Sequence, residues 1–367
     1  MTHRSAQYDM VVIGGGPAGS AAAIAGRRAK LRVLIVERGA APRPGACPGW
    51  LGPAAVRLCR ECGVRTAGVG VEFRGLRLCS WDLKSRVEAR DAELKGWLVD
   101  PSALSAALLG AAGARGAEHL CGTYAERLQL GETHATLELS DGRAVAGQVV
   151  VLADGADAPS ARLVHLTVRA QTGPTGACAH AVFETSEPGD GLDVVLGAGR
   201  GLKLASFARR GTQVRATLVT HDDSAPATAQ LAALLEAAKN EGILPPAANP
   251  APVPAPYLAG LALEMETHVA KRCVLVGDAG GFVSAFSNEG IYPALRSGWL
   301  AAETVARALK APLLQDELAA FSSTWRADLA GYLRMPNTDL GLLLPMIFNN
   351  PQMSKRVARA FLLGQAF

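Results

Sequence analysis

Three glycines near the start of the chain are spaced as G-x-G-x-x-G, a pattern that can hold the pyrophosphate of a dinucleotide. Gly14 allows a sharp turn after an apolar run, Gly16 lets the backbone approach a phosphate, and Gly19 lets a helix pack closely. The N-terminus of that helix presents free N–H groups to the anion. Glu37 follows about 20 residues later, where a carboxylate can bind ribose hydroxyls. The pattern predicts dinucleotide binding and leaves FAD and NAD open.

A second motif, in residues 273–309, decides between the two cofactors. An apolar strand leads to Gly277 and Asp278, a loop of small residues follows, and a long helix is predicted to begin near Gly290. Asp278 can bind a ribitol hydroxyl. The N–H groups of residues 289–291 can face the N1–C2=O edge of a flavin, where the helix dipole stabilises negative charge. We therefore predict non-covalently bound FAD. The predicted cofactor-binding residues are Gly14, Gly16, Pro17, Ala18, Gly19, Glu37, Arg38, Asp278, Gly290 and Ile291.

The remaining cysteine and histidine patterns predict no metal site. Cys59 and Cys62 form a C-x-x-C on a segment that is typical of a helix ending at Gly63. No second C-x-x-C and no histidine pair follows at zinc spacing, so we interpret them as two thiols on a helix face. The histidines at 180, 221 and 268 are scattered, and we expect each to be solvated or hydrogen-bonded rather than a ligand.

Alternating and periodic segments indicate the elements that position these motifs. Residues 11–39 predict a strand, a turn, a helix and a second strand, and residues 99–120 predict a helix capped by Asp100. Short strands run up to Ala153, and three or four longer strands occupy residues 176–220. A helix is expected from about 225 to 241, before a proline-rich connector in 245–256.

Composition favours a globular protein of about two domains. The chain has 367 residues, of which 49% are apolar and 19% charged. Its net charge of +4 is too mild to favour nucleic acid as a partner. We expect no signal peptide, because the apolar run at Val11 leads directly into the glycine loop. We expect no membrane span, because no window holds the roughly 18 apolar residues that one needs. Seven cysteines without a dense framework favour a reducing cytoplasm.

Both motifs resemble those of the geranylgeranyl reductase family, within the larger flavoprotein group that includes the aromatic hydroxylases. The segments G-D-A-G-G-F-V (277–283), E-G-I-Y (289–292) and Ala294 with Ser297-Gly298 carry the resemblance, together with residues 8–38 and Asp154-Gly155. It implies an α/β fold: a glutathione-reductase-type, Rossmann-like FAD-binding domain with an inserted antiparallel substrate domain and a helical C-terminal region. The implied boundaries are 1–63, 95–160 and 262–312 for the FAD-binding domain, 64–94 and 161–261 for the substrate domain, and 313–367 for the C-terminal region.

The sequence departs from the family at three places. Ala285 and Asn288 replace Pro and Gly in the flavin loop, and asparagine tolerates a left-handed backbone. Pro101 stands where the family often has an arginine that contacts FAD. The aromatic motif that lines the lipid channel of archaeal reductases has no counterpart in "GAGRGLKLASFARRG".

The resemblance also draws attention to Cys47, since the family passes this segment over the flavin and often places a cysteine there. Cys47 lies between Pro44-Gly45 and Pro48-Gly49, which stiffen the turn. One interpretation makes it a catalytic thiol near flavin N5 or C4a. The other makes it a buried structural thiol. Trp50 could wall the substrate pocket or belong to the core.

Three functions stay open at this point. The first is reduction or desaturation of C=C bonds in an apolar, isoprenoid or polyketide-like substrate by hydride transfer at flavin N5. The second is monooxygenation with NAD(P)H and O₂, and the third is electron transfer or assembly without turnover. NAD(P)H is the candidate electron donor, and the oligomeric state stays open. The tail (340–367) could lie on a membrane as a basic amphipathic helix or pack over the substrate domain.

Overall fold

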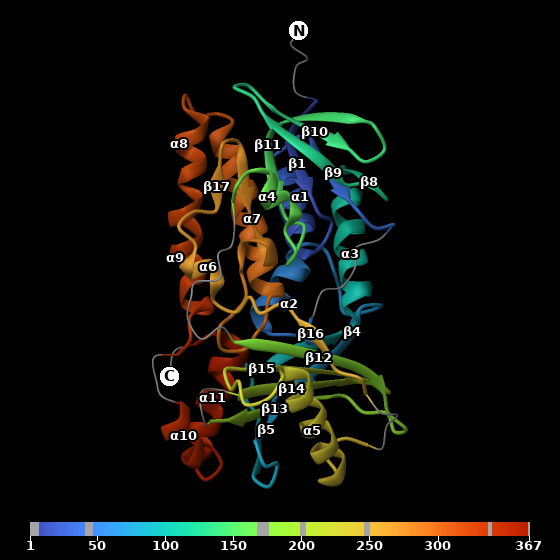
Figure 1. Cartoon of the computed structure of the whole chain (residues 1–367), viewed down its shortest axis with the longest axis vertical. Helices are drawn as coiled ribbons and strands as arrows, with labels where there is room; N and C mark the ends of the chain where they lie inside the picture. The colour runs from blue at the N-terminus through green and yellow to red at the C-terminus, as the bar shows by residue number, and fades with distance from the viewer. Residues whose placement is uncertain are drawn as a thin grey trace.

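The computed structural model describes residues 7–40, 47–166, 176–198, 203–245, 250–336 and 340–365. The strands of these residues form three sheets. The largest lies in the upper half of the molecule in Figure 1, and a second lies across the lower half.

The largest sheet is built around parallel strands that begin and end the nucleotide-binding part of the sequence. Val11 and Ile13 face one core, and Met10 and Val12 face the other, so both faces are covered. The parallel strands, in spatial order, are β18 (Cys273–Leu275), β11 (Ala144–Leu152), β1 (Tyr8–Ile13), β2 (Val33–Glu37) and β8 (Glu118–Cys121). Antiparallel strands extend it: β17 (Val269–Ala270), β10 (Ala135–Leu139) and β9 (Ala125–Leu130).

Two helices from opposite ends of the chain pack against each other on one face of this sheet. They are α1 (Pro17–Arg28) and α7 (Ile291–Ala308), flanked by α3 (Pro101–Ala114) and α2 (Pro53–Glu61). Their contact is very close, because a Cβ at Gly298 of α7 would lie 2.1 Å from the carbonyl oxygen of Ala18 in α1. Small residues along α1 permit this approach, and residues 18–26 of the helix are all buried.

The second sheet has seven strands and carries different side chains on its two faces. One face packs on α5 (Ala227–Asn240), and the other faces the FAD-binding domain and, at one end, α10 (Leu340–Ile347) and α11 (Pro351–Leu363). We call the latter the inner face. The strand order is β16 (Val253–Ala255), β12 (Ala177–Glu184), β15 (Gln213–Thr220), β14 (Lys203–Arg210), β13 (Gly191–Gly197), β5 (Leu76–Ser80) and β6 (Arg86–Ala89), antiparallel except for β13 and β5.

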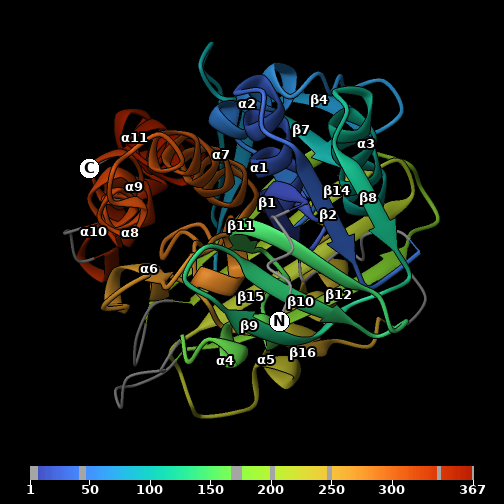
Figure 2. The ribbon, with the colours of Figure 1, turned by 90° about the horizontal axis from the view of Figure 1, so that it is seen from above.

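A small third sheet joins the two halves. It pairs β3 (Trp50–Leu51) and β4 (Gly70–Arg74) with β7 (Lys95–Val99), so segments assigned to both predicted domains meet in it. Seen from above, the C-terminal helices gather on one side of the molecule (Figure 2). The remaining helices are α4 (Pro159–Leu163), α6 (Leu261–Glu264), the 3₁₀ helix η1 (Gly277–Gly280), α8 (Leu314–Ala319) and α9 (Phe321–Leu333).

The predicted α/β fold class is confirmed, and one predicted element is wrong in extent. The helix predicted over 99–120 ends at Ala114, although Asp100 caps it as expected through the N–H groups of Ser102 and Ala103. Gly116 has a φ of +84°, a left-handed conformation that stops the helix. Residues 118–121 then form β8 instead, parallel to β2.

We predict that Gly298→Ala destabilises the protein by about 1–3 kcal/mol, because the added methyl group forces α1 and α7 apart. Gly331→Ala is the matched control, since a Cβ at this position in α9 meets nothing within 4 Å. The control should leave stability unchanged or raise it by about 0.5–1 kcal/mol. Urea unfolding followed by circular dichroism measures both, and equal stability of the two variants would contradict the close helix contact.

Candidate functional site

A cavity of about 490 Å³ lies at the carboxyl ends of the parallel strands, where open α/β sheets bind ligands. Nearly all the predicted cofactor-binding residues line it, although they come from opposite ends of the sequence. Those at the cavity are Gly14, Gly16, Pro17, Ala18, Glu37, Arg38, Asp278, Gly290 and Ile291. Gly19 lies behind the wall, where a Cβ would be 1.9 Å from the carbonyl oxygen of Gly14. The predicted packing role of Gly19 therefore matches its position.

The N-terminus of α1 opens onto this cavity. Gly14 turns the chain off β1 with a φ of +103°, and a Cβ there would lie 2.2 Å from the carbonyl oxygen of Ala153. A Cβ at Gly16, the N-cap, would meet nothing within 4 Å, so this residue borders open space. No side chain caps the helix, which leaves its first N–H groups available to an anion.

Glu37 fixes the neighbouring backbone in the wall of the cavity. Its Oε2 accepts a hydrogen bond of 2.7 Å from the N–H of Gly15, and its Oε1 accepts one of 2.9 Å from the N–H of Gly39. Each carboxylate oxygen has further lone pairs for ribose hydroxyls. Nearby, the guanidinium of Arg38 lies 5.5 Å from the centroid of the Tyr124 ring.

The C-terminal motif also contributes to the cavity wall. Asp278 lies in η1, and a Cβ at Gly290 would lie 3.3 Å from its Oδ1, so this carboxylate is beside the N-cap of α7. Burial raises the pKa of Asp278 to about 6. The N-cap of α7, Gly290, has no side chain, and the Glu289 carboxylate accepts a hydrogen bond from the N–H of Tyr292 in the first turn. Asn288 adopts the left-handed conformation that we expected it to tolerate, with a φ of +54°.

These residues fit FAD. The N-termini of α1 and α7 open onto one cavity, and both Glu37 and Asp278 line it. Asp154 adds an acceptor, because its buried Oδ1 has no hydrogen-bond partner in the described part of the chain. The α1 terminus would hold the pyrophosphate and Glu37 the adenosine ribose. Asp278 would hold the ribitol chain, and Gly290 with Ile291 the flavin edge.

Two thiols lie in the wall of the same cavity. Cys47 was predicted, whereas Cys178 on β12 was not. The side-chain amide of Asn288 lies 3.7 Å from the sulfur of Cys178, which ties this thiol to the flavin loop. Burial raises the pKa of each thiol to about 11, so both are protonated at neutral pH. Pro44 and Gly45, which precede Cys47, lie outside the described residues.

Other candidates from the sequence lie elsewhere. Cys59 and Cys62 are fully buried around the end of α2 and do not border the cavity. Trp50 is core rather than pocket wall, with its ring 4.8 Å from that of Phe361. His268 is buried and bonds the carbonyl oxygen of Gly280 at 2.9 Å. Within the described residues, no three His, Cys, Asp or Glu side chains gather as a metal site.

Polar side chains gather on the inner face of the seven-stranded sheet, close to Cys47. His180 pairs in register with Thr217, whose hydroxyl lies 2.8 Å from that of Ser206. Arg215 packs its stem against the Cys47 turn, since a Cβ at Gly49 would lie 2.6 Å from its Cδ. The buried Nε of Arg215 and Nδ1 of His180 have no hydrogen-bond partner among the described residues. Sequence reasoning missed this group because strand pairing assembles it.

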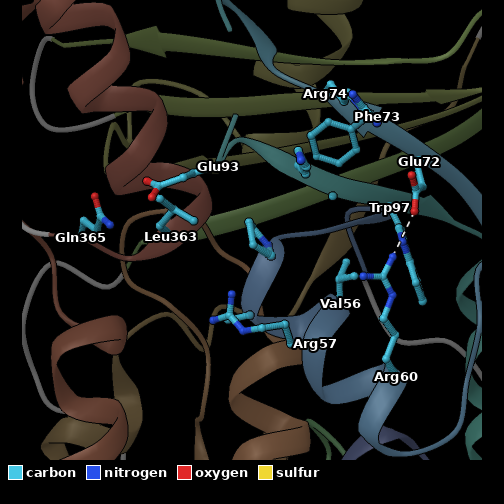
Figure 3. A pocket seen from close by; sticks show the side chains of 14 residues that line it. Val56, Arg57, Arg60, Glu72, Phe73, Arg74, Glu93, Trp97, Leu363 and Gln365 are labelled. Carbon is cyan, nitrogen blue, oxygen red and sulfur yellow. Dashed lines mark hydrogen bonds and ion pairs between the residues drawn. The ribbon is translucent and has the colours of Figure 1, made fainter. Parts of the chain in front are cut away.

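A second cavity of about 440 Å³ lies between α2, the small sheet and the end of α11 (Figure 3). Glu72 pairs with Arg60 at 3.0 Å, and Glu93 pairs with Arg359 at 2.7 Å. The other cations at this cavity are Arg57, Arg74 and Lys95. They are exposed, so water solvates their charges and they do not require an anionic ligand. The first cavity is therefore the candidate functional site.

The C-terminal tail packs on the protein. Val357, Phe361 and Leu362 of α11 are 0–1% exposed and belong to the core beneath the inner face of the seven-stranded sheet. The apolar side of α11 is thus covered by the rest of the protein. This is the packed arrangement, the second of the two that the sequence left open. Among the residues described, no helix is both long and apolar enough to span a membrane.

Comparison with protein families decides the class of the protein. A family model described as pyridine nucleotide-disulphide oxidoreductase matches residues 8–244, more than half of the chain. The chain belongs to this family. It is therefore an FAD-dependent oxidoreductase, a flavoprotein of the type predicted from its two motifs.

Two curated relatives match a shorter part of this flavoenzyme. They are the proteins named menaquinone reductase in two strains of Mycobacterium tuberculosis, each 31% identical over 159 residues. The match covers 42% of this chain and 39% of each relative, so the chain aligns with about two fifths of their length.

Solved structures share the fold over nearly the whole chain. A geranylgeranyl bacteriochlorophyll reductase-like protein from Thermoplasma acidophilum has a TM-score of 0.76 at 15% identity, with 97% of this chain and 96% of that chain covered. The flavin-dependent brominase Bmp2 gives 0.74 at 18% identity, covering 98% and 94%. PqsL from Pseudomonas aeruginosa gives 0.69 at 21% identity, covering 95% and 99%. At such identities the likeness shows the fold alone, and at that level it bears out the resemblance to geranylgeranyl reductases.

We predict that Asp278→Ala loses FAD, because the substitution removes the carboxylate at the ribitol end of the cavity. The wild-type flavoenzyme should be yellow, and boiling should release its FAD. Asp328→Ala is the control, since this carboxylate pairs with Arg296 at 2.6 Å and does not border the cavity. The ratio of flavin to protein absorbance measures retention, and full retention by Asp278→Ala would contradict its assignment.

Proposed function

We propose that the flavoenzyme reduces, or in reverse desaturates, C=C bonds of an apolar small-molecule substrate, with isoprenoid and polyketide-like molecules as candidates. The supporting observation is the pair of protonated thiols, Cys47 and Cys178, at the cavity beside the flavin loop. FAD, when bound, supplies hydride transfer at its N5 atom. Cys47 would hold a proton at its sulfur and pass it to the second carbon of the double bond, so that one hydride and one proton saturate the bond.

The inner face of the seven-stranded sheet supports an apolar substrate with one polar end. The cavity beside this face is lined with apolar side chains, among them those of Leu258 and Val283. The β12 and β15 side of the face contributes the unpaired nitrogen atoms of His180 and Arg215. In this proposal the apolar part lies along the first group, and an oxygen-bearing end meets the second.

Reduction rather than oxygenation is supported by the curated relatives, which are reductases by name. A monooxygenase has the same fold and is the alternative that must be tested. We also propose NAD(P)H as the electron donor, because the family is described by its use of pyridine nucleotides.

Consumption of NADPH with and without O₂ separates these functions, with menaquinone as the first trial substrate. A reductase should oxidise NADPH anaerobically only when substrate is present. After reoxidation of any quinol in air, mass spectrometry should still show a product with two added hydrogens. Consumption of O₂ that substrate triggers would favour a monooxygenase. A flavin that neither NADPH nor NADH reduces would contradict the proposed donor. Mass spectrometry of small molecules that copurify with the protein extends the substrate search.

We predict that Cys47→Ser slows substrate reduction by about 10²–10⁴, the usual effect of losing a positioned proton-transfer group. The two side chains are close in volume, so FAD content and fold should persist. Single-turnover oxidation of the dithionite-reduced flavin by substrate measures this step.

The buried thiols of α2 provide the control for this experiment. Cys59→Ser and Cys62→Ser should leave the rate unchanged, because neither residue borders the cavity. Cys178→Ser tests whether the second cavity thiol shares the role. Wild-type turnover by Cys47→Ser would make Cys47 a packing residue and would point to another proton source.

A further inference from the structure

We propose that Glu289, a buried carboxylate beside the FAD cavity, takes up a proton when the bound flavin is reduced. This inference rests on FAD binding and is independent of the substrate. Its basis is a carboxylate that is enclosed at the flavin end of α7 without a cation to neutralise it.

Glu289 is completely buried, and two tyrosines donate hydrogen bonds to its carboxylate. Its Oε1 accepts from the N–H of Tyr292 at 2.8 Å, and its Oε2 accepts from the hydroxyl of Tyr332 at 2.8 Å. Tyr292 lies in the first turn of α7 and Tyr332 lies in α9, and their rings are 4.9 Å apart. The next two residues, Gly290 and Ile291, border the cavity. Glu289 therefore lies immediately behind the backbone that would face the flavin.

The ionisable groups around Glu289 offer it no positive charge. Among the described residues, the groups that interact with its carboxylate electrostatically or by a hydrogen bond are Asp278 of η1, Cys47, Cys59 of α2, Tyr292 and Tyr332. No ion pair joins Glu289 to a cation within the described residues. Burial is the main cause that raises the pKa of Glu289 to about 7, and the carboxylate of Asp278 adds to it.

Reduction of the flavin places a new negative charge in this environment. With FAD bound, two electrons and one proton would leave the ring with a negative charge, which the N-terminus of α7 would stabilise. An ionised Glu289 lies at the same helix end and opposes this stabilisation, because like charges repel strongly where water is excluded. A second proton, taken up from solvent at a Glu289 oxygen, removes the repulsion.

The direction of the pH effect follows from these charges. Well below a pKa of about 7, Glu289 is already protonated in both redox states and takes up nothing. Above that pKa it is ionised while the flavin is oxidised. The flavin anion raises its pKa further, so reduction adds a proton to Glu289 in the window above about pH 7.

Glu289→Gln tests the inference, since glutamine keeps an oxygen acceptor and removes the charge. The midpoint potential of the bound flavin is measured against pH in anaerobic titrations with dithionite. Above about pH 7 the wild type should take up two protons for two electrons, and the variant one. Glu303→Gln, an exposed carboxylate on the same helix, should behave like the wild type. Equal slopes for wild type and Glu289→Gln would overturn the inference.

A second measurement applies to the unmodified protein, whether or not the variant retains FAD. The reduced-minus-oxidised infrared spectrum at about pH 8 should show a new band from a protonated carboxyl group. Tyr332→Phe removes a hydrogen bond that stabilises the ionised form of Glu289. It should therefore raise the pKa of Glu289 and move the start of the proton-uptake window to a higher pH. Absence of the carboxyl band in the wild type would overturn the inference. Loss of substrate turnover with the band intact would instead count against the proposed function.

Discussion

The contact between α1 and α7 is the constraint on which the cofactor site depends. The two helices come from opposite ends of the chain, and Gly298 lets the backbone of one lie against the backbone of the other at Ala18. This contact sets both helix N-termini at one cavity, at the carboxyl ends of β1 and β18. A larger residue at Gly298 would separate the helices. The N-termini of α1 and α7 would then no longer open onto the same cavity.

The cavity combines two helix N-termini with one arginine, Arg38, among its described lining residues. Pro101 borders it at the position where related reductases often have an arginine, and Arg210 reaches Asp100 next to it at 3.4 Å. The acidic residues near the flavin end have raised pKa values because burial disfavours their charged forms. Partial positive charge from two helices and low negative charge on the carboxyl groups together suit a ligand that is anionic and becomes more so on reduction.

The positions of the proposed cofactor residues around the cavity could be predicted because their signals are local in the sequence. A glycine at a fixed interval specifies a turn whatever the rest of the chain does, and an acid at the end of a strand keeps its place at the sheet edge. The glycines at 14, 16 and 19, with Glu37 and Asp278, therefore lie where the sequence indicated. The helix over 99–120 was predicted too long because Gly116 outweighs the apolar period around it.

The residues that could select the reaction lack such signals. Cys178, His180 and Arg215 meet only because β12 pairs with β15 and the inner face then turns toward the cofactor domain. Tyr332 reaches Glu289 from a helix 43 positions further along the chain. Contacts of this kind depend on tertiary packing, and they can change while the glycine contacts and helix termini persist. A shared fold at 15–21% identity therefore includes a reductase-like protein and a brominase, and the chemistry of each member must be found in its own inner face and flavin loop.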